Sequence, residues 1–262
     1  MNVKKFKAVI FDFDGTLYDN SGIGKALVFS APLDMFKIRA DRIARKRLWG
    51  CDENSQEKFD EFFFERASKF AHVSSQKYKK WYEERYQKIF LNALKKKRFR
   101  VRPNVEKVFS ALCESGAKIA IFSDYKNVRE RMLAIGIHEK SMELCAGFFS
   151  APEFGCLKPA PRGFLQVAGN LGVAPKQCLV VGDRADTDGQ GALHAGMSFV
   201  QIKAHENSEK KNDVKLFGNN QTQILNARLK SNARKFSASS NSAPHEILDW
   251  SEFANFCFLD AI

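Results

Sequence analysis

The sequence predicts an α/β fold in which helices cover both faces of a parallel sheet. Short apolar runs rich in β-branched and aromatic residues occur at 8–11, 118–122 and 179–181, and weaker runs occur at 145–149 and 199–202. This composition is typical of strands that are buried on both faces. Helix-like segments separate the runs, and strands that alternate with helices pair in parallel. The 262 residues, 44% of them hydrophobic, are enough for a large core.

The first apolar run leads directly into two carboxylates. Residues 8–11 are followed by Asp12 and Asp14, and Gly15 marks the turn after them. An open α/β sheet places its functional groups at the carboxyl ends of such strands. Two carboxylates this close repel each other, which favours a shared proton or a bound cation between them. A strand end capped by solvated acids has the same pattern, so this motif alone does not distinguish a functional site from a solvated strand end.

The chain from 21 to 98 predicts an all-helical segment. Apolar side chains recur at helical spacing in three stretches, at 33–43, 59–70 and 78–94. Many of these side chains are aromatic, and we interpret them as the core of a small helical bundle. A nucleic-acid surface lined by aromatic rings is the alternative.

The same segment holds most of the positive charge. The whole chain has a net charge of +12, and residues 20–100 contain 20 Lys and Arg against 10 Asp and Glu. A basic surface favours anionic partners, which include phosphorylated small molecules, nucleic acid and lipid headgroups. A solvated basic face without a ligand fits equally well. We expect a phosphorylated small molecule, and neither nucleic acid nor a membrane.

From residue 101 onward the chain alternates between helix and strand patterns, and polar residues follow the strands. Arg102 and Pro103 end the helical segment. The predicted elements are a helix at 105–114, a strand at 118–122, a helix at 127–134, a strand at 145–149, a helix at 163–171, a strand at 179–181, a helix through 192–195 and a strand at 199–202. The polar residues at these strand ends are Ser123, Asp124, Lys158 and Asp183.

Residues 205–243 differ from the rest of the chain. Asn, Ser, Lys and Gln dominate this stretch, which predicts a solvent-exposed insertion or flexible loop with one short helix at 224–229. The following residues, 247–253, are apolar enough to return to the core. We therefore expect the 205–243 stretch to be internal rather than a free tail.

The six cysteines are scattered and form no CxxC pair, so we expect reduced thiols. No run of eighteen apolar residues and no signal-peptide pattern occurs. These observations predict a soluble cytoplasmic protein. They give no prediction of the oligomeric state.

Taken in order, the strand ends resemble the four motifs of the haloacid dehalogenase-like hydrolase superfamily, and its phosphoglycolate-phosphatase-like branch in particular. Residues 12–17 match the first motif, 122–124 the second, 157–159 the third, and 181–197 the fourth. The resemblance implies a Rossmann-like core built from 1–20 and 99–262, with 21–98 inserted as a helical cap. Such a cap would close over the site, exclude water and select the substrate.

The resemblance also implies a role for each matched position. It makes Asp12 the nucleophile, Asp14 the general acid and base, and Lys158 a catalytic cation that also binds the phosphate. The further predicted roles are substrate binding by Thr16, Ser123 and Asp124, and Mg²⁺ binding by Asp12, Asp183, Asp188 and the main-chain carbonyl of Asp14. Asp186 competes with Asp188 for the second acidic position of the fourth motif. We assign Asp188 because it keeps the usual distance to the Ala-Gly-Met that follows.

The expected activity is a magnesium-dependent phosphatase that hydrolyses a small phosphorylated metabolite through an aspartyl-phosphate. A phosphomutase shares the same aspartates and stays open. A phosphonatase would need a Schiff-base lysine from the cap. A dehalogenase is disfavoured, because carbon–halogen displacement needs neither Asp14 nor Asp183. From a different class, a binding protein without catalysis could use the basic cap to hold nucleic acid or a protein.

Overall fold

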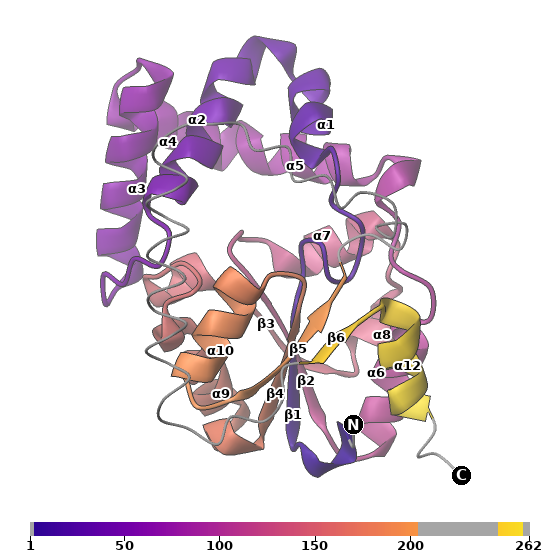
Figure 1. Cartoon of the computed structure of the whole chain (residues 1–262). Helices are drawn as coiled ribbons and strands as arrows, with labels where there is room; N and C mark the ends of the chain where they lie inside the picture. The colour runs from indigo at the N-terminus through magenta and orange to yellow at the C-terminus, as the bar shows by residue number, and fades with distance from the viewer. Residues whose placement is uncertain (1–2, 204–245, 259–262) are drawn as a thin grey trace, which may run out of the picture. The chain divides into compact units, whose positions relative to one another are not determined.

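The predicted parallel sheet is confirmed. The computed structural model describes residues 3–203 and 246–258. In it, strands pair in parallel in the order β3-β2-β1-β4-β5-β6 (Figure 1). The strands are β1 Ala8–Asp12, β2 Lys118–Ser123, β3 Cys145–Ser150, β4 Cys178–Gly182, β5 Ser198–Ile202 and β6 Glu246–Leu248.

The register places three strand ends side by side. Asp12 at the end of β1 pairs with Phe122 of β2, and Phe11 pairs with Val181 of β4. All residues of β1 and β4 are buried, as their unbroken apolar sequences predict. The loops that follow β1, β2 and β4 therefore leave the sheet at one edge, where their polar side chains meet.

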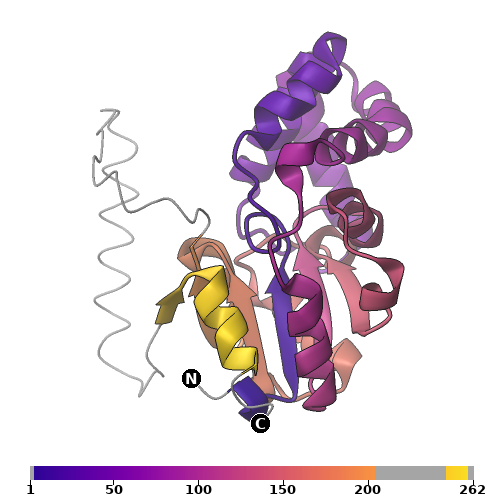
Figure 2. The same cartoon turned by 90° about the vertical axis from the view of Figure 1, so that its right-hand side faces the viewer.

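Alternate residues of β1 build two separate cores on the two faces of the sheet. Phe11 packs against Phe109 and Phe253 on one face, and Ile10 belongs to the cluster around Phe164 on the other. The first face is covered by α6 Val105–Glu114, α7 Val128–Ile135, α8 Glu139–Met142 and α12 Trp250–Phe258, and the second by α9 Pro161–Leu171 and α10 Gln190–His194 (Figures 1 and 2).

A helical block lies beyond the carboxyl edge of the sheet (Figure 1). Its elements are α1 Ile23–Ser30, α2 Met35–Arg47, α3 Gln56–Ala71, α4 Ser75–Trp81, a π-helical stretch at Tyr82–Tyr86 and α5 Gln87–Leu94. The π-helical stretch joins α4 to α5, so the predicted single helix at 78–94 is continuous but contains a wider turn. Tyr82 and Tyr86 stack within it, with ring centroids 4.9 Å apart. The aromatic stripes of 59–70 and 78–94 contribute many side chains to this core, as predicted, but Phe62 and Phe70 of the first stripe are exposed and lie outside it.

The prediction for 33–43 was wrong in part. Leu33 and Phe36 are 96% and 67% exposed, so they do not belong to the core. Pro32–Asp34 forms a 3₁₀ turn, and α2 begins only at Met35. This start puts the small and polar residues of α2 on its buried face, with Ile38 as the large apolar member. Helix α1 was not predicted, because its eight residues are too short to display a helical period.

The predictions for the C-terminal part of the chain, 205–253, are tested only in part. The 205–243 stretch and its short helix lie outside the described residues. The return of 247–253 to the core is confirmed by the buried side chains of Trp250 and Phe253, although the three-residue strand β6 was not foreseen. The division into a core domain and a cap domain stays a prediction. In the described ranges 3–203 and 246–258, no helix combines the length and apolar character needed to span a bilayer.

Candidate active site

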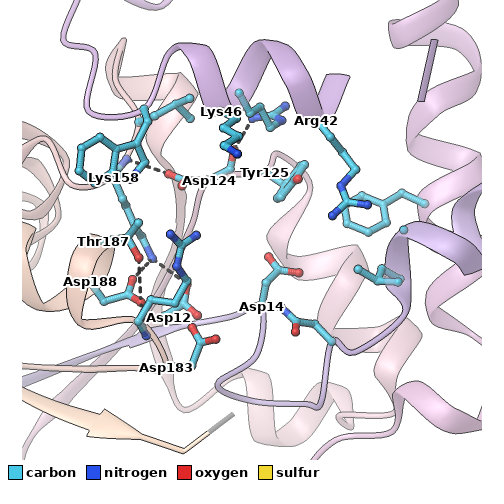
Figure 3. Close-up of a pocket in the computed structure, with 18 of the residues that line it drawn as sticks. Asp12, Asp14, Arg42, Lys46, Asp124, Tyr125, Lys158, Asp183, Thr187 and Asp188 are labelled. Atoms are coloured by element: carbon cyan, nitrogen blue, oxygen red, sulfur yellow. Dashed lines mark hydrogen bonds and ion pairs between the residues drawn. The ribbon is translucent and has the colours of Figure 1, made fainter. Parts of the chain in front are cut away.

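A cavity of about 630 Å³ lies between the carboxyl edge of the sheet and the helical block. The sheet contributes Asp12 at the end of β1 and side chains from the loops after β1, β2 and β4, including Asp14 and Asp183. The helical block contributes α1, α2 and Phe90 of α5. Figure 3 shows Asp12, Asp183 and Asp188 on one side, and Arg42 and Lys46 of α2 on the other. The volume falls in the range of small-molecule sites.

Three carboxylates from two strand ends form a cluster that could hold a metal ion. Asp12, Asp183 and Asp188 each offer an oxygen, and these oxygens lie within 4.8 Å of one another. Asp12 ends β1, and the other two follow β4. Carboxylate oxygens are the ligands that Mg²⁺ prefers, so the donor set fits the predicted cation. Asp188 belongs to this cluster, whereas Asp186 forms an exposed ion pair with Arg184 at 2.7 Å. The role of Asp188 as a metal ligand stays a prediction.

Two glycines leave room for the carboxylates of the cluster. Gly15 adopts a φ of +99°, and a Cβ there would lie 2.3 Å from Asp183 Oδ2. A Cβ on Gly182 would lie 2.5 Å from the Cβ of Asp188. The Asp-x-Asp-Gly and Gly-Asp sequences are therefore needed for packing as well as for chemistry.

Lys158 joins two members of the cluster. Its side chain is only 3% exposed, and Nζ donates to Asp12 Oδ1 at 2.7 Å and to Asp188 Oδ1 at 2.8 Å. A third bond reaches the main-chain carbonyl of Phe122 at 2.9 Å. Burial by itself would lower the pKa of Lys158, but the charges of Asp12 and Asp188 raise it above its ordinary value. The ammonium is therefore charged when it faces the cavity.

The carboxylate cluster carries more negative charge than Lys158 neutralises. Burial and the charge of Asp188 raise the pKa of Asp12 to about 7, against the opposing effect of Lys158. Burial and the charge of Asp12 raise the pKa of Asp183 to about 9. A divalent cation at this position would favour the ionised form of both groups. The electrostatics and the ligand geometry thus point to the same kind of occupant.

The carboxylate of Asp14 points away from the cluster toward a buried arginine. Arg131 of α7 forms an ion pair with Asp14 Oδ1, and Tyr18 Oη donates to the same oxygen at 2.6 Å. Ser123 Oγ donates to Oδ2 at 3.0 Å. Arg131 was not predicted, because nothing in the sequence distinguishes it from the exposed Arg129 on the same helix.

Thr16 and Ser123 orient the two aspartates. Thr16 Oγ1 donates to Asp12 Oδ2 at 2.9 Å, and Ser123 contacts Asp14. Both side chains are fully buried, and neither lines the cavity. Their predicted contact with a substrate stays a prediction. Asp124 does line the cavity, and its Oδ1 accepts a hydrogen bond from the main-chain N–H of Lys158 at 3.0 Å.

Arg45 of α2 ties the helical block to the sheet. Its Nη1 donates to the main-chain carbonyl of Asp124 at 2.7 Å, and its Nε contacts Asp41 at 3.2 Å. The guanidinium also lies over the rings of Phe63 and Tyr125, at 4.8 and 4.2 Å from their centroids. Arg45 was not predicted either, because its partner at the end of β2 is 79 residues away.

Comparisons with known proteins agree with this arrangement. A family model described as haloacid dehalogenase-like hydrolase matches residues 6–196. A glyceraldehyde 3-phosphate phosphatase of Methanopyrus kandleri is 34% identical over 42% of this chain, and the match spans only 48% of that relative. A protein of the same name from Methanothermobacter thermautotrophicus is 26% identical over 81% of this chain and 92% of its own length. The fold is similar to that of L-2-haloacid dehalogenase from Xanthobacter autotrophicus, with a TM-score of 0.56, 18% identity and 98% of each chain covered.

Proposed function

The chain belongs to the haloacid dehalogenase-like hydrolases, and from this membership we propose that it is a magnesium-dependent phosphatase acting on a small phosphorylated metabolite. The observation that carries the proposal is the set of contacts around Asp12. Lys158 and Thr16 hold one oxygen each of this carboxylate, beside Asp183 and Asp188. The two archaeal relatives described above are both named as phosphatases.

Asp12 is the proposed nucleophile. An oxygen of its carboxylate attacks phosphorus, the bond from phosphorus to the ester oxygen breaks, and an aspartyl-phosphate forms. Lys158 offsets negative charge on Asp12 and on the transferring group, because its ammonium already contacts that carboxylate. Mg²⁺, held by Asp12, Asp183 and Asp188, would supply the positive charge that lets a phosphate dianion approach three carboxylates.

Asp14 is the proposed proton carrier. Asp14 follows Asp12 by two residues, and its side chain, which is 18% exposed, lines the cavity. A protonated Asp14 gives its proton to the leaving alkoxide, and the resulting carboxylate then deprotonates the water that attacks the aspartyl-phosphate. That second attack releases inorganic phosphate and regenerates Asp12. Because Tyr18, Ser123 and Arg131 occupy both oxygens of Asp14, at least one of these contacts has to open for each proton transfer.

The test is hydrolysis of p-nitrophenyl phosphate and of a panel of phosphorylated metabolites that includes glyceraldehyde 3-phosphate. Wild-type protein should turn over at least one of them with Mg²⁺ and lose turnover with excess chelator. Asp12→Asn should stay folded and lose nearly all activity, because an amide neither attacks phosphorus nor binds the cation well. Asp186→Asn is the matched control, since that exposed carboxylate lies outside the cluster, and it should keep its activity. Substantial turnover by folded Asp12→Asn would overturn the proposal.

A further inference from the structure

The wall of the cavity opposite the carboxylate cluster is basic. Arg39, Arg42 and Lys46 all line the cavity from α2. Spacings of three and four residues place them on one face of that helix. Figure 3 shows Arg42 and Lys46 on the side of the cavity opposite Asp12 and Asp183. The cavity therefore has a carboxylate end that could hold a cation and a separate cationic end.

None of these three cations forms an ion pair within the described part of the chain, and all three side chains are exposed. Arg42 acts on the buried carboxyl of Asp41 only through its charge, which opposes the rise in the pKa of Asp41. The other cations of the cavity differ from them. Arg45, on the same helix, is buried against Asp41, and Lys158 is paired within the cluster. Arg184, which also lines the cavity, forms an ion pair with Asp186. Cations that converge on a concave site without a partner are a recognition feature for an anion.

The position of Arg42 depends on a glycine of the neighbouring helix. A Cβ on Gly24 of α1 would lie 2.1 Å from Arg42 Nη1. The guanidinium of Arg42 therefore packs against the backbone of α1 at Gly24, the one glycine of this helix. Apolar side chains that include Ile23, Leu27 and Ile43 line the same cavity. They suit a short carbon body between two charged ends.

We propose that the substrate carries a second anionic group, a carboxylate or a second phosphate, bound by Arg39, Arg42 and Lys46. This inference rests on the proposed phosphatase function, with the phosphoryl group that is hydrolysed lying at Asp12. The cavity of about 630 Å³ has the size of a metabolite site. A phosphorylated small molecule with a distal acid therefore fits it better than a nucleic-acid polymer.

The test uses three phosphate esters on one three-carbon skeleton. Glycerol 3-phosphate has a neutral distal end, 3-phosphoglycerate has a carboxylate, and glycerol 1,3-bisphosphate has a second phosphate. At least one of the two anionic members should show kcat/KM about tenfold or more above that of glycerol 3-phosphate, mainly through KM, since its distal anion adds hydrogen bonds to charged groups. The comparison of 3-phosphoglycerate with glycerol 1,3-bisphosphate then shows whether the site prefers a carboxylate or a second phosphate.

Two variants locate the effect. Arg42→Gln should lower kcat/KM for the preferred anionic ester several-fold more than kcat/KM for glycerol 3-phosphate, so that most of the advantage of the anionic ester is lost. Arg47→Gln is the matched control, because Arg47 is an exposed arginine of α2 that does not line the cavity. It should behave like wild type on all three esters.

The outcomes separate this inference from the proposed function. Equal hydrolysis of the three esters, or equal effects of Arg42→Gln and Arg47→Gln, would overturn the second-anion site and leave the phosphatase intact. If no ester were hydrolysed, the proposed function would fail, and calorimetric titration of 3-phosphoglycerate and glycerol 1,3-bisphosphate would still decide on the site. Binding of either to Asp12→Asn that weakens about tenfold on adding Arg42→Gln, but not Arg47→Gln, supports it. If Arg42→Gln weakens the binding of neither ester more than Arg47→Gln does, the second-anion site is overturned.

Discussion

Arg131, a fully buried side chain, forms an ion pair with Asp14, which lines the cavity. The guanidinium lies against the rings of Phe13 and Phe90, at 4.5 and 4.4 Å from their centroids. Phe13 precedes Asp14, and Phe90 belongs to the helical block. The contact therefore connects the proposed proton carrier with both parts of the structure that enclose the cavity.

We expect Arg131→Met to lower the free energy of unfolding by roughly 3 kcal/mol, because it removes one partner of a buried ion pair. The partial exposure of Asp14 keeps the cost at the lower end of the range for such changes. Activity should fall as well, with a changed pH profile of kcat, since Asp14 loses one of the groups that hold it. Chemical denaturation and pH–rate profiles measure the two effects.

Arg129→Met on the same helix is the control, because Arg129 is exposed. It should leave both the stability and the pH profile close to wild type. Arg131→Lys restores the charge, so part of the wild-type profile should return. An Arg131→Met protein with a wild-type pH profile would show that the ion pair only supports the fold.

The second prediction concerns the carboxylate cluster without a cation. Burial raises the pKa values of Asp12 and Asp183 from 3.8 to about 7 and about 9. The folded state thus holds these protons more tightly than the unfolded chain does. This contribution to stability is complete below about pH 4 and is lost as the pH rises through 7 and 9.

Mg²⁺ should oppose that loss, because it favours the ionised carboxylates. The increase in Tm on adding Mg²⁺ should therefore be small at pH 5.5 and larger at pH 8.5, in scanning calorimetry with chelator as the reference. Asp183→Asn should reduce the pH dependence of the increase. A Mg²⁺ effect of the same size at both pH values would contradict the assignment of the cluster as the cation site.

The third prediction separates backbone strain from close contact at Gly15. Gly15→Ala and Gly116→Ala both place an alanine at positive φ, +99° and +82°, and this backbone strain alone should cost each variant about 1–2 kcal/mol of stability. Only the alanine at 15 would press on Asp183, since nothing lies within 4 Å of a Cβ at 116. Gly15→Ala should therefore also weaken Mg²⁺ binding, and Gly116→Ala should not. Equal Mg²⁺ affinities by calorimetry would argue against the proposed place of Asp183 at the cation.

The sequence predicts those parts of the molecule whose signal is local. Strands β1 and β4 are buried on both faces, so their apolar runs identify them, and each run ends at a site aspartate or at the glycine before one. Arg131 and Arg45 carry no local signal, because they act on partners 117 and 79 residues away. Leu33 and Phe36 have the right spacing for a core stripe and yet lie in solvent, since the chain turns at Pro32 before α2 begins. Periodicity does not determine where such a turn falls.

The last prediction concerns the excess of basic residues between 20 and 100. If those charges attract a phosphorylated substrate, kcat/KM should fall when KCl rises from 0.05 to 0.5 M, because salt screens the field outside the cavity. The value of kcat should change less, since the groups around Asp12 are buried and screened less. The fall should be steeper for the ester with more negative charge.

Nucleic-acid binding by the same basic face would give a different result. The logarithm of the affinity for a duplex or a single strand would then fall linearly with the logarithm of the salt concentration, with a slope that reflects the release of several counterions. This binding would survive Asp12→Asn. Measuring both salt dependences on wild type and Asp12→Asn separates the two uses of the charge. Tight, salt-sensitive nucleic-acid binding together with a salt-independent kcat/KM would contradict substrate attraction, because the basic face would then act on a polymer outside the cavity.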